Sequence, residues 1–317
     1  MLKLSGLMRL SIIIVSYNVK NFLERCIDSV KAASEGISHD IYVVDNNSAD
    51  GSAEMVAKKF PEVKLIRNKT NLGFSMANNL ALRHAGGEFI LFLNPDTIVE
   101  ENTLRKCLEF MDSHPGAGAM GVKMIDGKGK FLPESKRSLP TPLVALYKIG
   151  GLTTLFPRSK VFGKYYLGHL DKDKTHKIEV LTGAFFFARK SALDNTGWYD
   201  EDFFMYGEDI DLSLRILRKK YEIWYYPDTS IIHFKGESTR KTSINYIIVF
   251  YKAMIIYIRK HFDFPGKFMI LPVLYTAIWF RAGLSIAGRI AGRFMMPAIT
   301  IPSSLRKLTW KPVKQKN

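Results

Sequence analysis

The stretch FILFLNPDTIVE, residues 89–100, joins an apolar strand to a polar end that can do chemistry. Its first five residues are apolar and suit a strand, and the run ends abruptly at Asn94-Pro95-Asp96. A carboxylate at the end of a buried strand is costly unless a cation pairs with it. Asp96 is therefore a candidate ligand for a hard divalent cation, which in turn would neutralise a diphosphate.

Three other apolar runs in the first hundred residues have the same character. They are short, rich in β-branched residues and free of polar alternation, namely Leu10–Val15, Ile41–Val44 and Val63–Ile66. Such runs are typical of parallel strands that are buried on both faces. Segments with helical spacing lie between them, at Phe22–Val30, Ser52–Phe60 and Ser75–Ala85. This alternation predicts an α/β fold built on an open, doubly wound sheet.

Each of the four runs is followed by polar residues. The clusters are Ser16-Tyr17-Asn18, Asp45-Asn46-Asn47-Ser48, Arg67-Asn68 and Asn94-Pro95-Asp96. A single cluster is equally well explained as a turn, but four at one sheet edge indicate a binding site, because ligands bind at the carboxyl ends of parallel strands. Asp45 can accept a hydrogen bond from the imide N–H of uracil or thymine, and Tyr17 can stack on the same base.

The segment WYDEDFFMYGEDIDLSLRILRKKY, residues 198–221, concentrates acidic side chains at the start of a helix. Glu208, Asp209 and Asp211 follow a glycine that allows a turn, and an apolar helical face continues beyond them. Because acidic residues interact favourably with the helix dipole, a helix N-terminus is the simpler interpretation. With Glu201 and Asp202 nearby, however, there are more acids than a helix start requires. We therefore expect a carboxylate here to act as a general base that deprotonates a sugar hydroxyl.

The later segments have weaker patterns. Asp126-Gly127 predicts a hairpin turn, and Leu143–Lys177 is interpreted as a variable insertion that faces the substrate. His233 follows another strand-like run, and a lone histidine is more often structural. The Lys235, Gly236 and Ser238 that follow it nevertheless resemble a phosphate-binding loop.

The C-terminal part of the chain is both basic and apolar. The whole chain carries a net charge of +16, which favours acidic partners. Beyond Thr242 two strongly apolar segments are interrupted by Lys252, Pro272 and Arg281, which predicts helices that lie at an anionic membrane surface. A helical hairpin packed on the main domain, or against a second copy in a homodimer, is the alternative. Nucleic-acid binding is not expected, because the basic residues are interleaved with long aliphatic stretches.

Six motifs together resemble a known family. They are SIIIVSYN, VVDNNSADGS, NLGFSMANN, LFLNPD, TGAFFFARK and GEDIDLSLR. In this order they resemble the family 2 glycosyltransferases with the GT-A fold, and most closely the rhamnosyltransferase-like branch, over about Leu10–Ser238. We expect a GT-A catalytic domain with a doubly wound mixed sheet over residues 1–242. Residues 243–317 are expected to form a helical extension that associates with a membrane or forms a dimer.

The resemblance implies a role for each matching residue. The base and ribose of a nucleotide-sugar would be bound by Ser16, Tyr17, Asn18 and Asp45, with Asn47 and Ser48 supporting the loop. The nucleotide-sugar pocket would be lined by Asn71, Gly73, Phe74 and Asn78, and the sugar and acceptor bordered by Thr182, Gly183 and Ala184. Asp96 would ligate Mg²⁺ or Mn²⁺, with His233 as an additional metal ligand. Asp209 would be the catalytic base, and Glu208 is the less favoured candidate.

One residue departs from the family pattern. Many members carry Asp-x-Asp at the metal site, whereas this chain has Asn94-Pro95-Asp96. Asn94 would hydrogen-bond to ribose or to a metal-bound water, so the site loses one charge and weaker metal binding is expected. The Gln-x-x-Arg-Trp motif of processive members does not occur in the sequence, so one sugar is expected to be transferred per encounter.

Together these features predict an inverting glycosyltransferase. The donor would be a UDP- or dTDP-sugar, with dTDP-rhamnose among the candidates, and the acceptor a hydroxyl of a glycan or lipid-linked acceptor in cell-surface polysaccharide synthesis. The expected location is the cytoplasmic face of the cell membrane. A non-catalytic scaffold that binds nucleotide-sugars with the same fold is the alternative. A sugar-phosphate nucleotidyltransferase is disfavoured because IIIVSYNVKNF, residues 12–22, contains no glycine for a phosphate loop.

Overall fold

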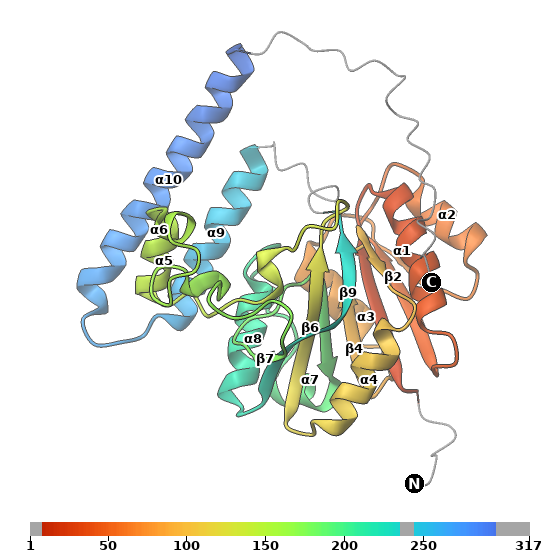
Figure 1. Ribbon diagram of the computed structural model, residues 1–317. Helices are drawn as coiled ribbons and strands as arrows, with labels where there is room; N and C mark the ends of the chain where they lie inside the picture. The colour runs from red at the N-terminus through yellow and green to blue at the C-terminus, as the bar shows by residue number, and fades with distance from the viewer. Residues whose placement is uncertain (1–7, 235–243, 296–317) are drawn as a thin grey trace.

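The computed structural model describes residues 8–234 and 244–295 (Figure 1). Its strands are β1 (Leu10–Ser16), β2 (His39–Asp45), β3 (Lys64–Arg67), β4 (Phe89–Leu93), β5 (Thr97–Val99), β6 (Ala117–Ile125), β7 (His176–Lys177), β8 (Phe185–Arg189) and β9 (Glu222–His233). Its helices are α1 (Lys20–Ala33), α2 (Ser52–Lys59), α3 (Phe74–Leu82), α4 (Thr103–Ser113), α5 (Pro142–Ile149), α6 (Leu152–Leu155), α7 (Lys190–Thr196), α8 (Glu208–Arg218), α9 (Ile244–His261) and α10 (Lys267–Met295), with short 3₁₀ turns at Pro133–Ser135 and Lys164–Tyr166. The predicted phosphate-binding loop at Lys235, Gly236 and Ser238 lies outside the described residues.

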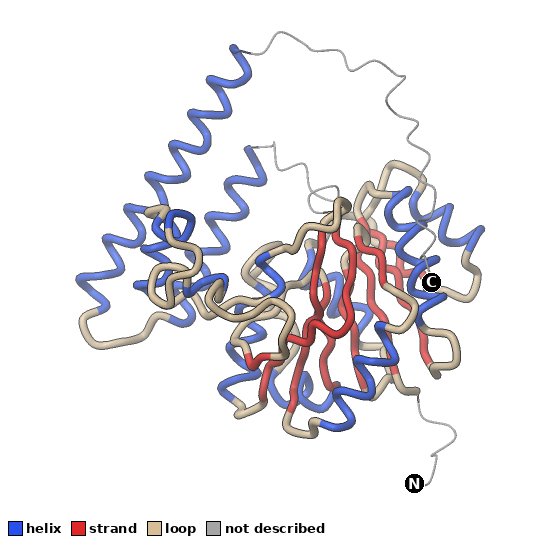
Figure 2. Tube along the Cα trace, in the orientation of Figure 1, coloured by secondary structure: helices blue, strands red, loops and turns tan. Residues whose placement is uncertain are grey.

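The described strands form one mixed sheet with helices around it (Figure 2). The strand order is β3-β2-β1-β4-β8-β6-β9-β5, and β7 pairs with β9 beside this path. The first four strands in this order are parallel, whereas β8 runs antiparallel to both β4 and β6. β9 is parallel to β6 and antiparallel to β5. The predicted doubly wound mixed sheet is confirmed.

The four predicted strands correspond to β1–β4, and three of them are buried. Every residue of β1 and β4 is buried, as are the last five residues of β2. β3 is different because it lies at the edge of the sheet, and its residues Lys64–Arg67 are partly or fully exposed. The prediction of a strand there is confirmed, but the prediction that it is buried on both faces is wrong, since an edge strand has solvent beside it.

Helices cover both faces of the sheet with their apolar sides. On one face, Leu23 of α1 and Leu104 of α4 pack with residues of β1, β4 and β6. On the other face, Ala77 of α3 and Leu212 of α8 pack with the alternate residues of the same strands. Burial of these side chains stabilises the fold by roughly 25 cal/mol per Å² of apolar surface.

Between residues 126 and 177 the chain forms a turn followed by short helices and a short strand. Asp126 N–H donates to the carbonyl of Lys130, and Ile125 forms a single antiparallel bridge with Phe131. The predicted turn is therefore present, but its second arm is one bridge rather than a strand. The segment Leu143–Lys177 contains α5, α6, a 3₁₀ turn and β7.

The C-terminal helices α9 and α10 form a third apolar cluster beside α5 and α8, away from the sheet (Figure 1). Tyr257 and Ile258 of α9 pack with Leu274 and Ile278 of α10, and Phe203 joins them from the segment before α8. The hairpin packed on the rest of the chain, which was the alternative to surface-bound helices, is therefore observed.

The outer side of α10 is nevertheless apolar and exposed. Phe268, Met269, Trp279 and Phe280 have 76%, 68%, 64% and 67% of their surface exposed. Residues 267–288 are long and apolar enough to cross a membrane by length and composition alone, and no second helix in the described part of the chain meets this criterion. Pro272 and Arg281 interrupt the apolar run of the sequence but not the helix.

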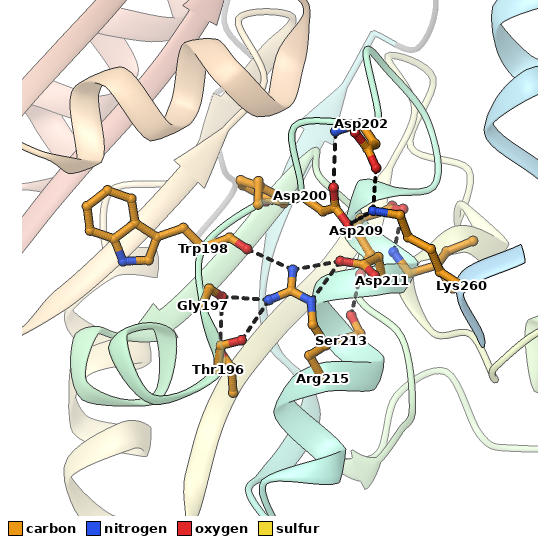
Figure 3. Close-up of polar contacts among 12 residues, drawn as sticks. Thr196, Gly197, Trp198, Asp200, Asp202, Asp209, Asp211, Ser213, Arg215 and Lys260 are labelled. Atoms are coloured by element: carbon orange, nitrogen blue, oxygen red, sulfur yellow. Dashed lines mark hydrogen bonds and ion pairs between the residues drawn. The ribbon is translucent and has the colours of Figure 1, made fainter. Parts of the chain in front are cut away.

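Arg215 holds the start of α8 to the segment that precedes it (Figure 3). Its guanidinium donates to Asp211 Oδ2 through Nε at 2.8 Å and Nη2 at 2.6 Å, and to the carbonyls of residues 196–198. On its other side, Asp211 Oδ1 lies 2.6 Å from Nε2 of His261 in α9. The buried Asp211 carboxylate therefore joins α9 to α8.

A second link between these parts of the chain is made by Lys260, which pairs with Asp200 and Asp202 (Figure 3). Two members of the predicted acidic cluster, Asp202 and Asp211, are thus bound to cations of α8 and α9. Their role is structural, and it explains part of the excess of acids that the sequence shows in this region.

Asp211→Asn should lower the free energy of unfolding by about 3 kcal/mol, because Arg215 and His261 lose a buried carboxylate partner. Chemical denaturation at neutral pH measures this loss. The control Asp202→Asn removes a carboxylate that is 68% exposed and should cost less than about 0.5 kcal/mol. Equal losses in the two variants would contradict the structural role of Asp211.

Candidate active site

The predicted site residues come from loops that meet at one edge of the sheet. β1, β2 and β4 are parallel and in register, so their carboxyl ends lie together. β8 begins at this same edge because it runs in the opposite direction, and its Phe185 pairs with Leu93 of β4. Asn94 N–H donates to the carbonyl of Ala184 at 3.1 Å. The segment 182–184 is thereby held next to Asn94.

The pairing of β5 with β9 brings the two predicted metal ligands together. Thr97 lies opposite His233 in this pair, and His233 Nε2 is 3.4 Å from Asp96 Oδ1. Both side chains are buried, and His233 Nδ1 has no hydrogen-bond partner among the described residues.

A cavity of about 680 Å³ opens over this edge of the sheet. The predicted site residues that line it are Tyr17, Asn71, Gly73, Phe74, Asn94, Asp96, Thr182, Gly183, Ala184, Glu208, Asp209 and His233. Its walls also include residues of α5, α9 and the Lys164–Tyr166 turn, so part of the predicted insertion does face the cavity. The candidate base and the candidate metal ligands therefore share one cavity.

The other predicted site residues do not line this cavity. They are Ser16, Asn18, Asp45, Asn47, Ser48 and Asn78. Asn18 N–H donates to Ser48 Oγ at 3.0 Å, and Ser48 N–H donates to Asp45 Oδ2 at 3.0 Å. Asn47 adopts a left-handed backbone, with φ of 65°, in this turn. These contacts tie the loops after β1 and β2 together around Asp45, whose Oδ1 is buried with no hydrogen-bond partner in the described residues.

Gly73 is required where the loop before α3 meets the segment before α8. Its φ is +81°, and an added Cβ would lie 2.3 Å from the carbonyl oxygen of Phe204. Phe74 N–H donates to that same oxygen at 2.6 Å, and Asn78 Nδ2 donates to Phe74 O at 2.9 Å. Asn46 Nδ2 donates to Gly73 O at 3.0 Å and also lines the cavity. Asn46 belongs to one of the predicted polar clusters, but its sequence context indicates no specific role.

Arg137 is a site residue that sequence reasoning missed. Its Nη2 lies 2.6 Å from Asp209 Oδ2, and both side chains are nearly buried. Burial lowers the pKa of Arg137, but the Asp209 carboxylate and Tyr165 together outweigh burial, and the net pKa is raised. The Asp209 carboxylate also accepts hydrogen bonds from the backbone N–H groups of Gly183 at 3.3 Å and Ile210 at 2.8 Å. Arg137 and Asp209 are 72 residues apart, so no local pattern links them.

The neighbouring carboxyl group of Glu208 has a different environment. It is buried, and its Oε2 has no hydrogen-bond partner among the described residues. Burial, followed by repulsion from the Asp209 carboxylate, raises the pKa of Glu208 to about 8. At neutral pH Glu208 is therefore mostly protonated and cannot accept a proton. A carboxyl group that keeps its proton at neutral pH is a poor base, so the Asp209 carboxylate, which is paired with Arg137, is the favoured candidate.

Asp96 and His233 fit a divalent cation when a substrate supplies further ligands. Carboxylate oxygen and imidazole nitrogen are both ligands for Mn²⁺, and such ions often bind one or two protein groups together with substrate phosphates. No cluster of three or more acidic, histidine or cysteine side chains suited to a metal occurs in the described residues. Asn94 lines the same cavity and offers an amide in place of a second carboxylate.

The raised pKa of Glu208 predicts that stability falls with rising pH between 4.5, the ordinary value, and about 8. In this window the unfolded chain releases a proton that the folded chain retains. Glu208→Gln has no such titration and therefore no such loss of stability. The Tm of Glu208→Gln minus the Tm of the unmodified chain should increase as the pH rises from about 5 to about 8.5. Glu54→Gln, at an exposed site, is the control and should leave the pH dependence unchanged. If calorimetry finds that the Tm of Glu208→Gln depends on pH in the same way as the Tm of the unmodified chain, the raised pKa of Glu208 is contradicted.

Comparison with known proteins agrees with this geometry. A family model described as "Glycosyl transferase family 2" matches residues 11–197. An N-acetylglucosaminyl-diphospho-decaprenol L-rhamnosyltransferase of Mycobacterium tuberculosis (strain ATCC 25618 / H37Rv) is 26% identical over 260 residues, which cover 78% of this chain and 83% of that protein. The rhamnosyltransferase WbbL of Escherichia coli (strain K12) is 24% identical over 238 residues, 72% of this chain and 84% of the relative.

Solved structures share the fold. A mannosyltransferase of Pyrobaculum calidifontis, PcManGT in complex with GDP-Man and Mn²⁺, superposes with a TM-score of 0.56 at 18% identity, over 95% of this chain and 79% of that one. Residues 1–349 of TarS from S. aureus give a TM-score of 0.51 at 19% identity, over 78% of this chain and 65% of that one. The family match spans more than half of the sequence, and the chain therefore belongs to glycosyl transferase family 2, as a glycosyltransferase with the GT-A fold.

Proposed function

We propose that this enzyme transfers one sugar, with inversion at the anomeric carbon, from a UDP- or dTDP-sugar to a hydroxyl of a glycan or lipid-linked acceptor in cell-surface polysaccharide synthesis. The observation that carries the proposal is the shared cavity, which is lined by Asp209, the Asp96–His233 pair and the loops from the ends of β1, β2 and β4. The names of the mycobacterial and Escherichia coli relatives support a rhamnosyl donor such as dTDP-rhamnose.

The chemistry assigned to the site is a single displacement. Asp209 accepts the proton of the acceptor hydroxyl as the oxygen forms a bond to C1 of the sugar. The bond from C1 to the diphosphate oxygen breaks on the opposite face, and the nucleoside diphosphate leaves with the electron pair. Arg137 and the N–H groups of Gly183 and Ile210 hold the Asp209 carboxylate in one position. A divalent cation held by Asp96 and His233 would neutralise the leaving diphosphate.

Donor recognition is assigned to the loops after β1 and β2. The buried Oδ1 of Asp45, which has no hydrogen-bond partner among the described residues, suits an acceptor for the imide N–H of uracil or thymine. Tyr17 is 44% exposed, lines the cavity and is available to stack on that base. Asn71, Gly73 and Phe74 are assigned to the sugar-diphosphate side of the same wall.

Asp209→Asn should lower kcat by roughly 100-fold or more at saturating donor, because the amide cannot accept the proton. The donor Kd should stay within about threefold, since the amide keeps the shape of the side chain. Glu208→Gln is the matched control and should retain most of the activity at neutral pH. Undiminished transfer by Asp209→Asn would refute the assigned base. Donor binding without transfer in the unmodified protein would favour the scaffold alternative.

A calorimetric screen of nucleotide-sugars, with and without Mn²⁺, tests the donor and the metal together. We expect UDP- or dTDP-sugars to bind and ADP-glucose to fail, because adenine has no imide N–H for Asp45. Mn²⁺ should strengthen donor binding, and Asp96→Asn should abolish that gain while leaving metal-free binding intact. A gain that persists in Asp96→Asn would rule out Asp96 as the ligand.

We further propose that residues 1–242 are the catalytic domain and that residues 243–317 attach it to the cytoplasmic face of the membrane. The exposed apolar side of α10 supports this, since aromatic and aliphatic side chains in water are better accommodated at a lipid interface. The tail from Arg259 onward is rich in lysine and arginine, with Asp263 as its single acid, which suits anionic lipid. A homodimer through α10 is the alternative.

Phe280→Asp should lower partitioning onto anionic phospholipid vesicles by roughly tenfold, because it places a charge on the apolar side of α10. Sedimentation with the vesicles measures the bound fraction, and Phe280→Leu is the control that keeps the apolar surface. If the bound fraction is unchanged and analytical ultracentrifugation shows that Phe280→Asp dissociates a dimer, the dimer interpretation replaces the membrane one.

A further inference from the structure

The insertion that precedes β7 carries an exposed apolar surface of its own, separate from that of α10. Residues 155–164, with the sequence LFPRSKVFGK, begin at the last residue of the short helix α6. Leu155, Phe156 and Val161 in this segment are 70%, 51% and 54% exposed. Several exposed large apolar side chains in one short segment mark a binding surface, because water accommodates them poorly. The segment 155–164 is called the insertion tip below.

The insertion tip is held in shape by its own contacts. Thr153 Oγ1 donates to the carbonyl of Phe162 at 2.9 Å, and the ring centroids of Phe156 and Phe162 lie 5.6 Å apart. At Gly163 an added Cβ would lie 2.3 Å from the carbonyl oxygen of Pro157, so the two sides of the tip are in close contact. Because the backbone is fixed in this way, the exposed apolar side chains cannot turn inward.

The insertion tip is also positively charged. The sequence contains no aspartate or glutamate in residues 135–170. Within this range Arg158, Lys160 and Lys164 belong to the tip, and all three are exposed. Exposed cations next to exposed apolar side chains are typical of a surface that binds anionic lipid.

Positive charge also surrounds His169, which follows the insertion tip. Burial lowers the pKa of His169, and the positive charges of Lys136 and Lys160 lower it further. The carboxylate of Asp173, which comes next along the chain, is paired with Lys123 at 2.5 Å. The tip and its surroundings therefore carry an excess of positive charge.

The insertion is attached to the C-terminal helices. Ala145, Leu146 and Ile149 of α5 pack against the third apolar cluster, which α9 and α10 form. Figure 1 shows α5 and α6 at the end of the molecule where these helices lie, far from α2. Tyr165 and Tyr166 of the same insertion line the cavity. The insertion therefore connects one wall of the cavity to the tip and to α10.

A lipid surface fits the insertion tip better than a second copy of the chain does. A symmetric contact between two tips would bring Arg158, Lys160 and Lys164 close to the same three cations, which repel one another. Anionic lipid headgroups neutralise such cations, and the acyl region beneath them accepts apolar side chains. Nucleic acid would pair with the cations but would leave Leu155 and Phe156 in water.

We propose that Leu155, Phe156 and Val161 of the insertion tip enter an anionic membrane surface, while the exposed cations of the tip contact the lipid phosphates. The tip is then a second membrane contact beside α10. Two contacts fix the orientation of the cavity relative to the bilayer, whereas a single helix leaves the catalytic domain free to rotate. The proposal rests on the membrane attachment proposed for residues 243–317 and extends it to the catalytic domain.

An environment-sensitive fluorophore at the insertion tip tests the contact directly. Leu155→Cys in the full-length protein is labelled with a nitrobenzoxadiazole maleimide, and the native Cys26 and Cys107 are fully buried, so they do not compete for the label. We expect the emission to shift to the blue when phosphatidylglycerol vesicles are added, and nitroxide-labelled lipid in these vesicles to quench it. Ala57→Cys, at an exposed position of α2, is the matched control and should show neither change.

Two outcomes of this experiment would overturn the proposal. The first is an unchanged emission at residue 155 while the full-length protein sediments with the vesicles, since α10 would then bind the membrane alone. The second is a blue shift that appears without vesicles as the protein concentration is raised, because it would show a contact between copies of the chain.

A substitution at the apolar part of the insertion tip measures its share of the binding. Phe156→Asp should lower partitioning onto phosphatidylglycerol vesicles roughly tenfold, because it places a charge where an apolar side chain enters the interface. Phe156→Leu keeps the apolar surface and is the control. Thermal unfolding checks that both variants are folded. Equal partitioning of Phe156→Asp and Phe156→Leu would overturn the proposal.

A second pair of variants tests the charged part. Lys160→Ala should weaken binding to phosphatidylglycerol vesicles roughly fivefold, because one contact with anionic lipid is lost. It should leave binding to neutral phosphatidylcholine vesicles unchanged. Lys58→Ala removes an exposed lysine from α2 and should have less than a twofold effect. Equal effects of the two variants would mean that only the net charge matters, and they would overturn the role of the tip.

Failure of this proposal and failure of the proposed function have different readouts. Nucleotide-sugar binding in solution together with an unchanged emission at residue 155 would retain the donor assignment and remove the insertion tip. A blue shift at residue 155 in a protein that binds no nucleotide-sugar would retain the membrane contact and remove the donor assignment.

Discussion

Antiparallel pairing of β8 with β4 is the constraint on which the candidate site depends. It places Phe185 opposite Leu93, so the segment that enters β8 lies at the edge where the parallel strands β1, β2 and β4 end. A parallel β8 would have begun at the opposite edge of the sheet. The same edge receives Asp96 and His233 through the pairing of β5 with β9. One sheet edge therefore collects side chains from segments that are far apart in the sequence.

Three acids within four residues at the start of α8 have three different environments. Asp211 is held by Arg215 and His261, which fixes α8 and α9 relative to each other. Asp209 faces Arg137 and the cavity, and Glu208 is buried, with a pKa raised to about 8. The simple explanation of these acids as a helix start is therefore insufficient, and so is the idea that all of them are catalytic. Helical geometry turns successive residues toward different neighbours, and those neighbours determine what each carboxyl group can do.

Much of the framework was predictable because it depends on local patterns. Short apolar runs indicated β1, β2 and β4, and helical spacing indicated α1, α2 and α3. The antiparallel insertion of β8 and the edge position of β3 were not indicated, because strand order depends on which neighbours pair across the sheet. Arg137 was missed for a related reason, since its link to Asp209 spans 72 residues and has no local sequence pattern.

The sequence alone indicated carboxylates and amides at strand ends, an acidic helix start, and a basic, apolar C-terminus. It did so because strand burial and helix amphipathicity are encoded at short range. Which of these groups share a cavity, and which acid is structural, is evident only in the folded protein. Those outcomes depend on long-range packing of strands and helices, which brings side chains together across large separations in the chain.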